Sequence, residues 1–421
     1  VVQASAAACE AGRLLAAARD TRTSERTFPA EKDVTAEVPR IGVFVCHCGI
    51  NIAGVVDVKS VAEYARSLPG VVYTEDILYA CSQDAQVHLR DVILAHGLNR
   101  VVVASCSPRT HEPLFQQTMR EAGLNPYFFE MANIRDQCSW IHAEQPAEAT
   151  VKSRDLVRMA VRKVSLAEPL RAASLNVTQS ALVIGGGLAG MTAALGIADQ
   201  GYDVTLVERE GRLGGNLHHL HWLLDEPDMA ARRRQLCERV QGHAHIRVLT
   251  GSTLSRADGY VGNFESTVAT PAGEQKVKHG VIVVATGGRE SKPSAYLYGS
   301  DRRVLTQQEF EARLAGGSGL AGVGSLVMIQ CVGSREPGHP YCSRVCCNTA
   351  VKNALRVKQL SPDTQIHILY RDVRTYGLNE DYYRQARQKG ILFVRYDLER
   401  KPTVAGGKTL LSEEQAQAAL E

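Results

Sequence analysis

The pattern of apolar and polar residues after position 40 alternates between strand-like runs and helix-like segments. Residues 41–45 and 100–104 are short apolar runs rich in valine, typical of buried strands, whereas residues 58–68 repeat apolar side chains at helical spacing. This alternation predicts an α/β domain with a parallel sheet. Both predicted strands run directly toward cysteine, at Cys46 and Cys106. Because ligand sites in open parallel sheets lie beyond the carboxyl ends of the strands, the two loops should share one sheet edge.

Five cysteines lie in this first region, and four thiolates are the usual ligand set of an iron–sulfur cluster. Free cysteine also packs as a small buried hydrophobe, so a purely structural role is an alternative. A redox-active pair at Cys46 and Cys48 is a third interpretation, although C-x-C lacks the geometry of the C-x-x-C motif. The spacing does not distinguish which four would bind a cluster. The candidate ligands are Cys46, Cys48, Cys81, Cys106 and Cys138.

A second region begins near residue 180 and carries a glycine motif in its required context. Residues 181–184 form a short apolar strand, followed by G-x-G-x-x-G and a helix that should end near Gly201. The first glycine permits a tight turn, the second lets the backbone approach a pyrophosphate, and the third lets helix and strand pack closely. The helix N-terminus favours the negative charge of a phosphate. The residues of this turn are Gly185, Gly187, Leu188, Ala189 and Gly190.

Two later segments extend the motif in a fixed order. A strand over 203–207 delivers Glu208, an acid placed to accept hydrogen bonds from ribose hydroxyls and to disfavour a 2′-phosphate. A Gly-Gly turn and then an A-T-G turn follow, as they do along the cofactor in two-dinucleotide-binding flavoproteins. The three elements together favour FAD over a bound nicotinamide or a degenerate empty site. The further candidate cofactor-binding residues are Arg209, Gly214, Gly215, Asn216, Ala285, Thr286 and Gly287.

A third predicted strand, over 325–330, should open a nicotinamide-nucleotide domain with its own glycine motif in such a flavoprotein. It runs instead into four cysteines with the spacing C-x10-C-x3-C-C, so no phosphate cradle is evident. Zinc also accepts four thiolates, but adjacent cysteines strain a tetrahedral site, and structural zinc sites usually show C-x-x-C pairs. We expect a 4Fe–4S cluster here rather than zinc, disulfides or unligated core thiols. The ligands would be Cys331, Cys342, Cys346 and Cys347.

A helix predicted over 348–358 carries Lys352 in its early turn. A cation at that place could lie beside a flavin and stabilise its reduced anionic form, which makes Lys352 the candidate catalytic residue. The alternative is a solvated surface lysine.

Composition excludes several classes of protein. The 421 residues carry a formal charge of +3 without a dense basic run, so nucleic acid is not the expected partner. With 44% hydrophobic residues, no apolar run approaches the roughly 20 residues that a membrane-spanning helix needs. The 11 cysteines are too sparse for a disulfide scaffold, and low-potential clusters with reduced thiols need a reducing compartment. We therefore expect a cytoplasmic location.

The chain divides into six expected segments. Residues 40–150 are expected to form the N-terminal α/β iron–sulfur domain, and a two-dinucleotide-binding FAD domain with the cysteine motif, expected to be incomplete, follows. An Ala-rich helix and a linker precede the first domain, a helix connects the two domains, and the final polar stretch carries little signal. The other expected ranges are 1–20 for the first helix, 21–39 for the linker, 151–179 for the connecting helix, 180–400 for the FAD domain and 401–421 for the tail.

Several runs of residues resemble the A subunit of heterodisulfide reductase, an FAD and iron–sulfur protein family. The resemblance covers about residues 40–400 and includes the cysteine motif over 331–347. The other runs are VCHCGINIAG at 45–54, ASCSPRTHEP at 104–113, NIRDQCSW at 133–140 and RTYGLNEDYY at 374–383.

The resemblance implies an N-terminal iron–sulfur domain, a thioredoxin-reductase-like FAD domain and an unusual cluster beside the flavin, with Lys352 near the reactive edge of the isoalloxazine. Two 4Fe–4S clusters are expected. It also implies electron bifurcation or its reverse, in which an electron pair is split between a high-potential, disulfide-type acceptor and ferredoxin. Partners would be B- and C-like subunits, ferredoxin and a donor module such as a hydrogenase or formate dehydrogenase, around a homodimer.

The sequence departs from the family pattern in three ways. Ferredoxin-type C-x-x-C-x-x-C runs do not occur in it, the second half of the FAD domain does not appear before the end, and residues 1–18 resemble the closing helix of an FAD domain. The last feature suggests a preceding FAD module and a segment of a longer polypeptide. Two other functions stay open, namely a non-bifurcating relay in quinone or sulfur metabolism and a scaffold with degenerate cofactor sites.

Overall fold

The computed structural model describes residues 2–21, 23–225, 228–317, 319–405 and 408–410, and the chain forms two compact units. One unit is Arg22–Leu175, and the other combines Val1–Thr21 with Asn176–Glu421. No helix within the described ranges is both long and apolar enough to cross a membrane.

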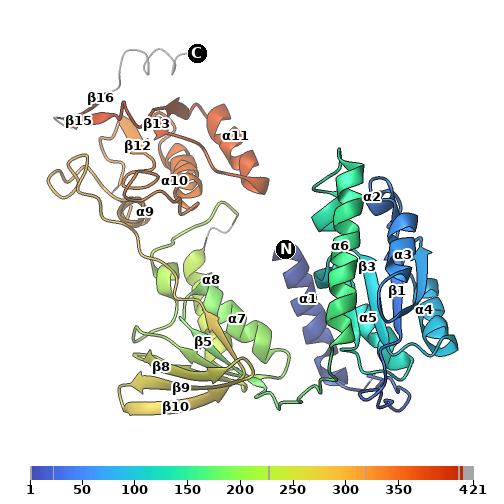
Figure 1. Ribbon diagram of the computed structural model, residues 1–421. Helices are drawn as coiled ribbons and strands as arrows, with labels where there is room; N and C mark the ends of the chain where they lie inside the picture. Colours follow the sequence, from blue (N-terminus) through green and yellow to red (C-terminus); the bar gives the residue numbers. More distant parts are fainter. Residues whose placement is uncertain (1, 22, 226–227, 318, 406–407, 411–421) are drawn as a thin grey trace. The chain divides into compact units, whose positions relative to one another are not determined.

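The unit Arg22–Leu175 is built on a four-stranded parallel sheet with the order β2-β1-β3-β4 (Figure 1). All six residues of the central strand β1 are buried, as expected for a strand covered on both faces. Because β1 pairs in parallel with β3, the loops that follow these two strands emerge at the same sheet edge. The strands are β1 (Ile41–Cys46), β2 (Val71–Ile77), β3 (Arg100–Ser105) and β4 (Phe129–Asn133).

Helices cover both faces of this sheet because successive side chains of β1 point to opposite sides. Val43 lies in the core shared with α3 and α6, and Phe44 lies in the core shared with α4 and α5. The helix expected only to connect the domains is therefore part of this unit, since α6 buries Val157 and Val161 against the sheet. The helices are α2 (Ile50–Ala53), α3 (Val58–Arg66), α4 (Gln83–Ala95), α5 (Pro108–Glu121) and α6 (Pro146–Ser165), with a π-helical turn at Arg135–Ser139.

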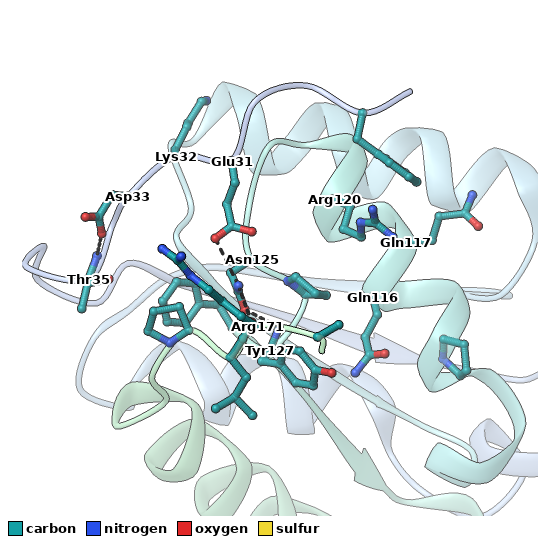
Figure 2. A pocket seen from close by; sticks show the side chains of 17 residues that line it. Glu31, Lys32, Asp33, Thr35, Gln116, Gln117, Arg120, Asn125, Tyr127 and Arg171 are labelled. Atoms are coloured by element: carbon teal, nitrogen blue, oxygen red, sulfur yellow. Dashed lines mark hydrogen bonds between the residues drawn. The ribbon is translucent and has the colours of Figure 1, made fainter. Parts of the chain in front are cut away.

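The segment expected as a linker at 21–39 is held against the same unit. Val34 is buried in the core, and the Arg120 guanidinium lies 4.0 Å from the centre of the Phe28 ring. Asn125 Nδ2 donates to Glu31 Oε1 at 3.1 Å, as Figure 2 shows, and to the Leu170 carbonyl at 3.0 Å. The chain therefore enters and leaves this unit at the same place.

The other unit contains a second parallel sheet with the order β11-β5-β6-β7. Val183 and Leu206 face the helices α7 and α8, whereas Leu182 packs against Val268 and Val277 of an antiparallel meander. The strands are β5 (Ser180–Ile184), β6 (Asp203–Val207), β7 (Ile246–Leu249) and β11 (Val281–Val284). The helices are α7 (Leu188–Ala198) and α8 (Met229–Gln241), and the meander is β8 (Thr253–Tyr260), β9 (Asn263–Thr270) and β10 (Gly273–His279).

The N-terminal helix α1 (Val2–Leu15), with a 3-10 turn at Ala16–Ala18, contacts α7 of this unit. Cys9 Sγ lies 3.8 Å from the Gly196 carbonyl. Arg19 donates to the Gln200 carbonyl, and its guanidinium lies 4.0 Å from the centre of the Tyr202 ring. The helix that resembles the end of a preceding FAD module thus packs on α7, the helix that follows the glycine motif of this chain.

A third parallel sheet, with the order β12-β13-β14, follows in the same unit. Its core lies between the sheet and α10, where Ala350, Ala354 and Val357 are buried. The expected tail contributes a two-stranded antiparallel pair, and residues 411–421 lie outside the described part. The elements are α9 (Gln307–Ala315), β12 (Ser325–Ile329), α10 (Cys346–Leu360), β13 (Gln365–Tyr370), α11 (Glu380–Gln388), β14 (Leu392–Arg395), β15 (Thr403–Ala405) and β16 (Lys408–Leu410).

We predict that Val103→Ala lowers the free energy of unfolding of the unit Arg22–Leu175 by about 2–3 kcal/mol. Val103 in β3 is buried, so its shortened side chain leaves a cavity in the core. Val72→Ala is the matched control, since Val72 in β2 is 54% exposed. A Trp222→Phe background leaves Trp140 as the only tryptophan, so its fluorescence during urea unfolding reports on this unit. Equal midpoints for the two alanine variants would contradict the burial of β3.

Candidate functional site

Two glycines of the motif are required by close contacts within the chain. Gly185 has φ +108°, and a Cβ there would lie 2.3 Å from the Ala285 carbonyl oxygen. A Cβ on Gly190 would lie 1.8 Å from the Gly185 carbonyl oxygen. No side chain fits at either position, because contacts below 3.0 Å cannot be relieved against backbone.

Gly187 differs from these two glycines. It is the residue before α7, and a Cβ built on it would meet no atom within 4 Å. The space beside the first turn of α7 is therefore open, and free N–H groups at a helix N-terminus favour a phosphate there. Leu188 and Ala189 in this first turn are at least partly accessible, Leu188 being 52% exposed.

The carboxylate of Glu208 connects the segments around this turn. Its Oε2 accepts the Gly186 N–H at 2.5 Å, and its Oε1 accepts the Glu210 N–H at 2.7 Å. Each carboxylate oxygen has a further lone pair, so these bonds leave room for a ribose hydroxyl. Arg209 is exposed and lies 3.4 Å from the carboxylate of Glu210.

The remaining predicted turns lie at the same sheet edge. Gly214 N–H donates to the Gly186 carbonyl at 2.8 Å, and Asn216 Nδ2 donates to the Gly288 carbonyl at 2.9 Å. Gly215 has φ +48°, and Ala285 N–H donates to the last residue of β5. The structure thus brings together the glycine turn, the acid, the Gly-Gly turn and the segment that contains Thr286 and Gly287.

The C-terminal cysteine set is also brought together. Cys331 follows β12 in a left-handed conformation (φ +61°), and Cys346 and Cys347 begin α10. The hydrogen bond between the last two thiols raises the pKa of Cys346 and lowers that of Cys347 to about 7. Cys331 and Cys342 also act electrostatically on the pKa of Cys347, so all four thiols lie in one region of this unit. The ionised thiolate is the form of cysteine that binds metals, so a thiol that ionises near neutral pH is suited to that role.

Four of the five cysteines in Arg22–Leu175 converge where β1 and β3 end. Cys46 Sγ accepts the N–H groups of Cys48 and Ala80 at 3.3 and 3.4 Å, while burial raises its pKa to about 11. Cys81 acts electrostatically on both Cys46 and Cys106. In a sheet of order 2-1-3-4 the switch point lies between β1 and β3, which is the usual place for a ligand.

Cys138 lies apart from this set. It is completely buried on the other face of the sheet, in the core that contains Ile52 and Val157. Burial raises the pKa of its thiol, and its polar neighbours are Ser153 and Lys152 rather than another cysteine.

The described residues include no group of three or more His, Cys, Asp or Glu side chains arranged to hold a metal ion. The cavity in Figure 2 is lined by some of the residues in 28–35 and 113–128 and by residues 169–172. None of the predicted site residues lines it.

Lys352 is buried, which differs from the surface alternative. Its Nζ lies 2.6 Å from Glu311 Oε2 and 3.1 Å from the Trp222 carbonyl oxygen, and the Lys352 and Glu311 side chains are only 5% and 1% exposed. Glu311 Oε1 accepts the His221 N–H at 2.7 Å. This ion pair joins α9, α10 and the loop after the Gly-Gly turn.

Comparison with known proteins identifies the chain's relatives. Residues 179–315 match the family model of pyridine nucleotide-disulphide oxidoreductases. The second iron-sulfur A subunit of CoB–CoM heterodisulfide reductase from Methanopyrus kandleri is 39% identical over 462 residues, covering 85% of this chain and 69% of the relative. The A subunit of the H2:CoB-CoM heterodisulfide, ferredoxin reductase from Methanothermobacter thermautotrophicus is 36% identical, covering 87% and 70%. The chain belongs to the A-subunit family of heterodisulfide reductases.

The alignment with the Methanopyrus protein is longer than this chain, so that relative carries segments without a counterpart here. Among solved structures, the thioredoxin reductase of Lactococcus lactis is 16% identical, with a TM-score of 0.35, over 55% of this chain and 67% of that chain.

Family membership and the sheet topology confirm the predicted α/β class and an oxidoreductase domain, since residues 179–315 match the pyridine nucleotide-disulphide oxidoreductase family. The iron–sulfur character of the N-terminal unit stays a prediction, as do the individual ligands.

Sequence reasoning missed three residues in this member of the heterodisulfide reductase family. Glu311 is an ordinary polar position of an amphipathic helix, and only its burial with Lys352 distinguishes it. Arg335 and Asp372 form an ion pair beside the C-terminal cysteines although 37 positions separate them. Arg335 stands within the cysteine motif, which is the only sequence signal for either residue.

We predict that Gly187→Ala lowers flavin affinity about tenfold or more, because the methyl group occupies the open space beside α7. A tenfold loss corresponds to about 1.4 kcal/mol of binding free energy. Thermal unfolding of the flavin-free protein should be unchanged, since that methyl group meets no protein atom. Gly190→Ala should disrupt the fold itself, and Gly211→Ala, which also meets nothing within 4 Å, is the control. A flavin dissociation constant in Gly187→Ala equal to that of the wild-type protein would contradict this site.

We predict that Cys81→Ala removes about four iron atoms per chain, whereas Cys138→Ala removes none. The reason is that Cys81 belongs to the set of four converging cysteines and Cys138 does not. Iron and acid-labile sulfide in protein purified without oxygen provide the measurement. Loss of iron in Cys138→Ala, with the fold retained by circular dichroism, would reverse the assignment.

Proposed function

We propose that this protein is the FAD- and 4Fe–4S-containing electron-transfer subunit of a heterodisulfide-reductase-like complex. The observation that carries the proposal is the placement of four cysteines between the end of β12 and the first turn of α10, in the same unit as the glycine turns. Four cysteines in one segment suit an iron–sulfur cluster, and all of them are free.

The chain's own residues would hold FAD in defined ways. The open backbone at Gly187 and the first turn of α7 would bind the pyrophosphate, and Glu208 would accept a hydrogen bond from the ribose. FAD supplies the ability to take up an electron pair and to release single electrons. The Gly-Gly and A-T-G segments would shape the rest of the binding surface.

Lys352 is the proposed catalytic residue. Glu311 and the Trp222 carbonyl bind its ammonium group, which holds the cation in a buried position. Burial makes its electrostatic influence stronger than that of a surface lysine. We assign it the stabilisation of negative charge on a reduced flavin.

We extend the partners of the relatives to this chain. The names of the Methanothermobacter relative include hydrogen, the CoB–CoM heterodisulfide and ferredoxin. We infer electron bifurcation or confurcation between a two-electron donor, ferredoxin and a disulfide-type acceptor, in a cytoplasmic complex with B- and C-like subunits and a donor module. The two cluster sites, one in each unit, give this protein separate places for single electrons.

The test is the cofactor content and the redox behaviour of protein purified without oxygen. About eight iron atoms, equivalent sulfide, one FAD and no zinc would support both cluster sites. The two one-electron steps of the flavin should occur in crossed order, the second more favourable than the first. Ordered steps would favour the simple relay, and absence of flavin and iron would leave the scaffold.

We predict that the double variant Lys352→Met with Glu311→Gln has a lower flavin midpoint potential than Glu311→Gln alone, because these two proteins differ only in the buried cation that stabilises the reduced form. The double variant is used because Lys352→Met alone leaves a buried carboxylate unpaired, at about 3–5 kcal/mol. Arg356→Met is the control, since Arg356 lies at a similar distance from the Trp222 ring, 5.7 Å against 5.5 Å, but is exposed. Equal flavin potentials in the double variant and in Glu311→Gln would remove Lys352 from this role.

A further inference from the structure

The guanidinium of Arg335 lies beside the C-terminal cysteine set. Its Nη1 is 4.0 Å from Cys331 Sγ, and its side chain is 18% exposed. Arg335 also has a left-handed backbone (φ +61°), which is uncommon for a residue with a side chain. A strained residue keeps such a conformation only when surrounding contacts hold it.

The contacts that hold Arg335 come from the segment after β13. The carboxylate of Asp372 forms an ion pair with the Arg335 guanidinium, and Arg371 Nη1 donates to the Arg335 carbonyl at 2.7 Å. The backbone carbonyl of Asp372 in turn accepts from Cys347 Sγ at 3.7 Å. Asp372 therefore connects the arginine at one end of the cysteine motif with a thiol at the other end.

We propose that Arg335 sets the reduction potential of the cluster held by these cysteines, as a positioning residue whose charge Asp372 partly balances. This inference rests on the proposed function, since it needs the cluster. Net charge and hydrogen bonds to the sulfurs are main determinants of cluster potentials. Arginine stays protonated at all accessible pH values, so its contribution is a fixed charge.

The direction of the effect follows from the charge balance. When the cluster takes up one electron, its negative charge increases by one and no bond is made or broken. A cation near a ligand sulfur stabilises the reduced form more than the oxidised form and raises the potential. Asp372 opposes this effect, so removing the arginine and removing the aspartate should shift the potential in opposite directions.

A similar pair occurs beside the cysteines of the unit Arg22–Leu175. Arg135 Nε lies 3.0 Å from Asp136 Oδ1, and its guanidinium lies 4.6 Å from the centre of the Trp140 ring. A side-chain contact with Cys48 and the charge of Cys106 both act on the pKa of Arg135. Burial raises the pKa of the Cys106 thiol, and the charge of Arg135 opposes that rise. Each cysteine set thus has an arginine that is paired with an aspartate, and Asp372 also lies 3.7 Å from Arg374 Nη2.

The experiment is an anaerobic redox titration of the full chain, monitored by electron paramagnetic resonance of the reduced clusters. Arg335→Gln should lower the midpoint of one cluster, and Asp372→Asn should raise the midpoint of the same cluster. We expect each shift to correspond to about a tenfold change in the ratio of reduced to oxidised cluster, which is about 59 mV for one electron. Arg335→Lys should restore most of the potential, and Arg135→Gln should shift the other cluster only.

Arg344→Gln is the matched control. Arg344 lies in the same cysteine motif and has a similar backbone conformation (φ +59°), but its side chain is exposed, so solvent screens its charge. Unchanged potentials in Arg335→Gln and Asp372→Asn, with full iron content, would overturn this inference and leave the proposed function intact. Shifts of the same sign in both variants would indicate a structural role and would also overturn it. Wild-type protein without iron would remove the proposed cluster, and this inference with it.

Discussion

The candidate chemistry of this protein depends on one constraint, which is that the strands of a parallel sheet end at a common edge. Each of the three parallel sheets places candidate functional residues there. Cys46 ends β1 and Cys106 follows β3. The glycine turn and Glu208 follow β5 and β6, and Cys331 and Asp372 follow β12 and β13. Residues far apart in the sequence become neighbours because the crossover helices return every strand in the same direction.

The second and third sheets use a similar strand-to-helix passage for different chemistry. After β5 the chain turns at Gly185 with φ +108°, and α7 begins at Leu188 with its N–H groups free for a phosphate. After β12 the chain turns at Cys331 with φ +61°, but a long loop precedes α10, and thiols occupy the start of that helix. Where the second sheet places backbone N–H groups at the start of α7, the third sheet thus places cysteine thiols at the start of α10.

Acidic side chains hold these loops in place. Glu208 accepts two backbone N–H groups, Glu311 fixes Lys352 and the loop at His221, and Asp372 fixes Arg335. A carboxylate can accept several hydrogen bonds, so one buried acid can join segments that share no regular secondary structure. The buried Lys352–Glu311 pair is costly to desolvate, and such a pair specifies a geometry more than it adds stability.

The sequence by itself determined the α/β alternation, the glycine motif and the two groups of cysteines, because these signals are local in period and spacing. Only the tertiary structure separated Cys138 from Cys46, since the side of the sheet that a residue faces depends on which elements pack around it. It also decided that Lys352 is buried and paired with Glu311, and that Arg335 meets Asp372, because these partners lie 41 and 37 positions apart. Periodicity describes neighbours along one element, whereas contacts of this kind are fixed when the sheets and helices assemble.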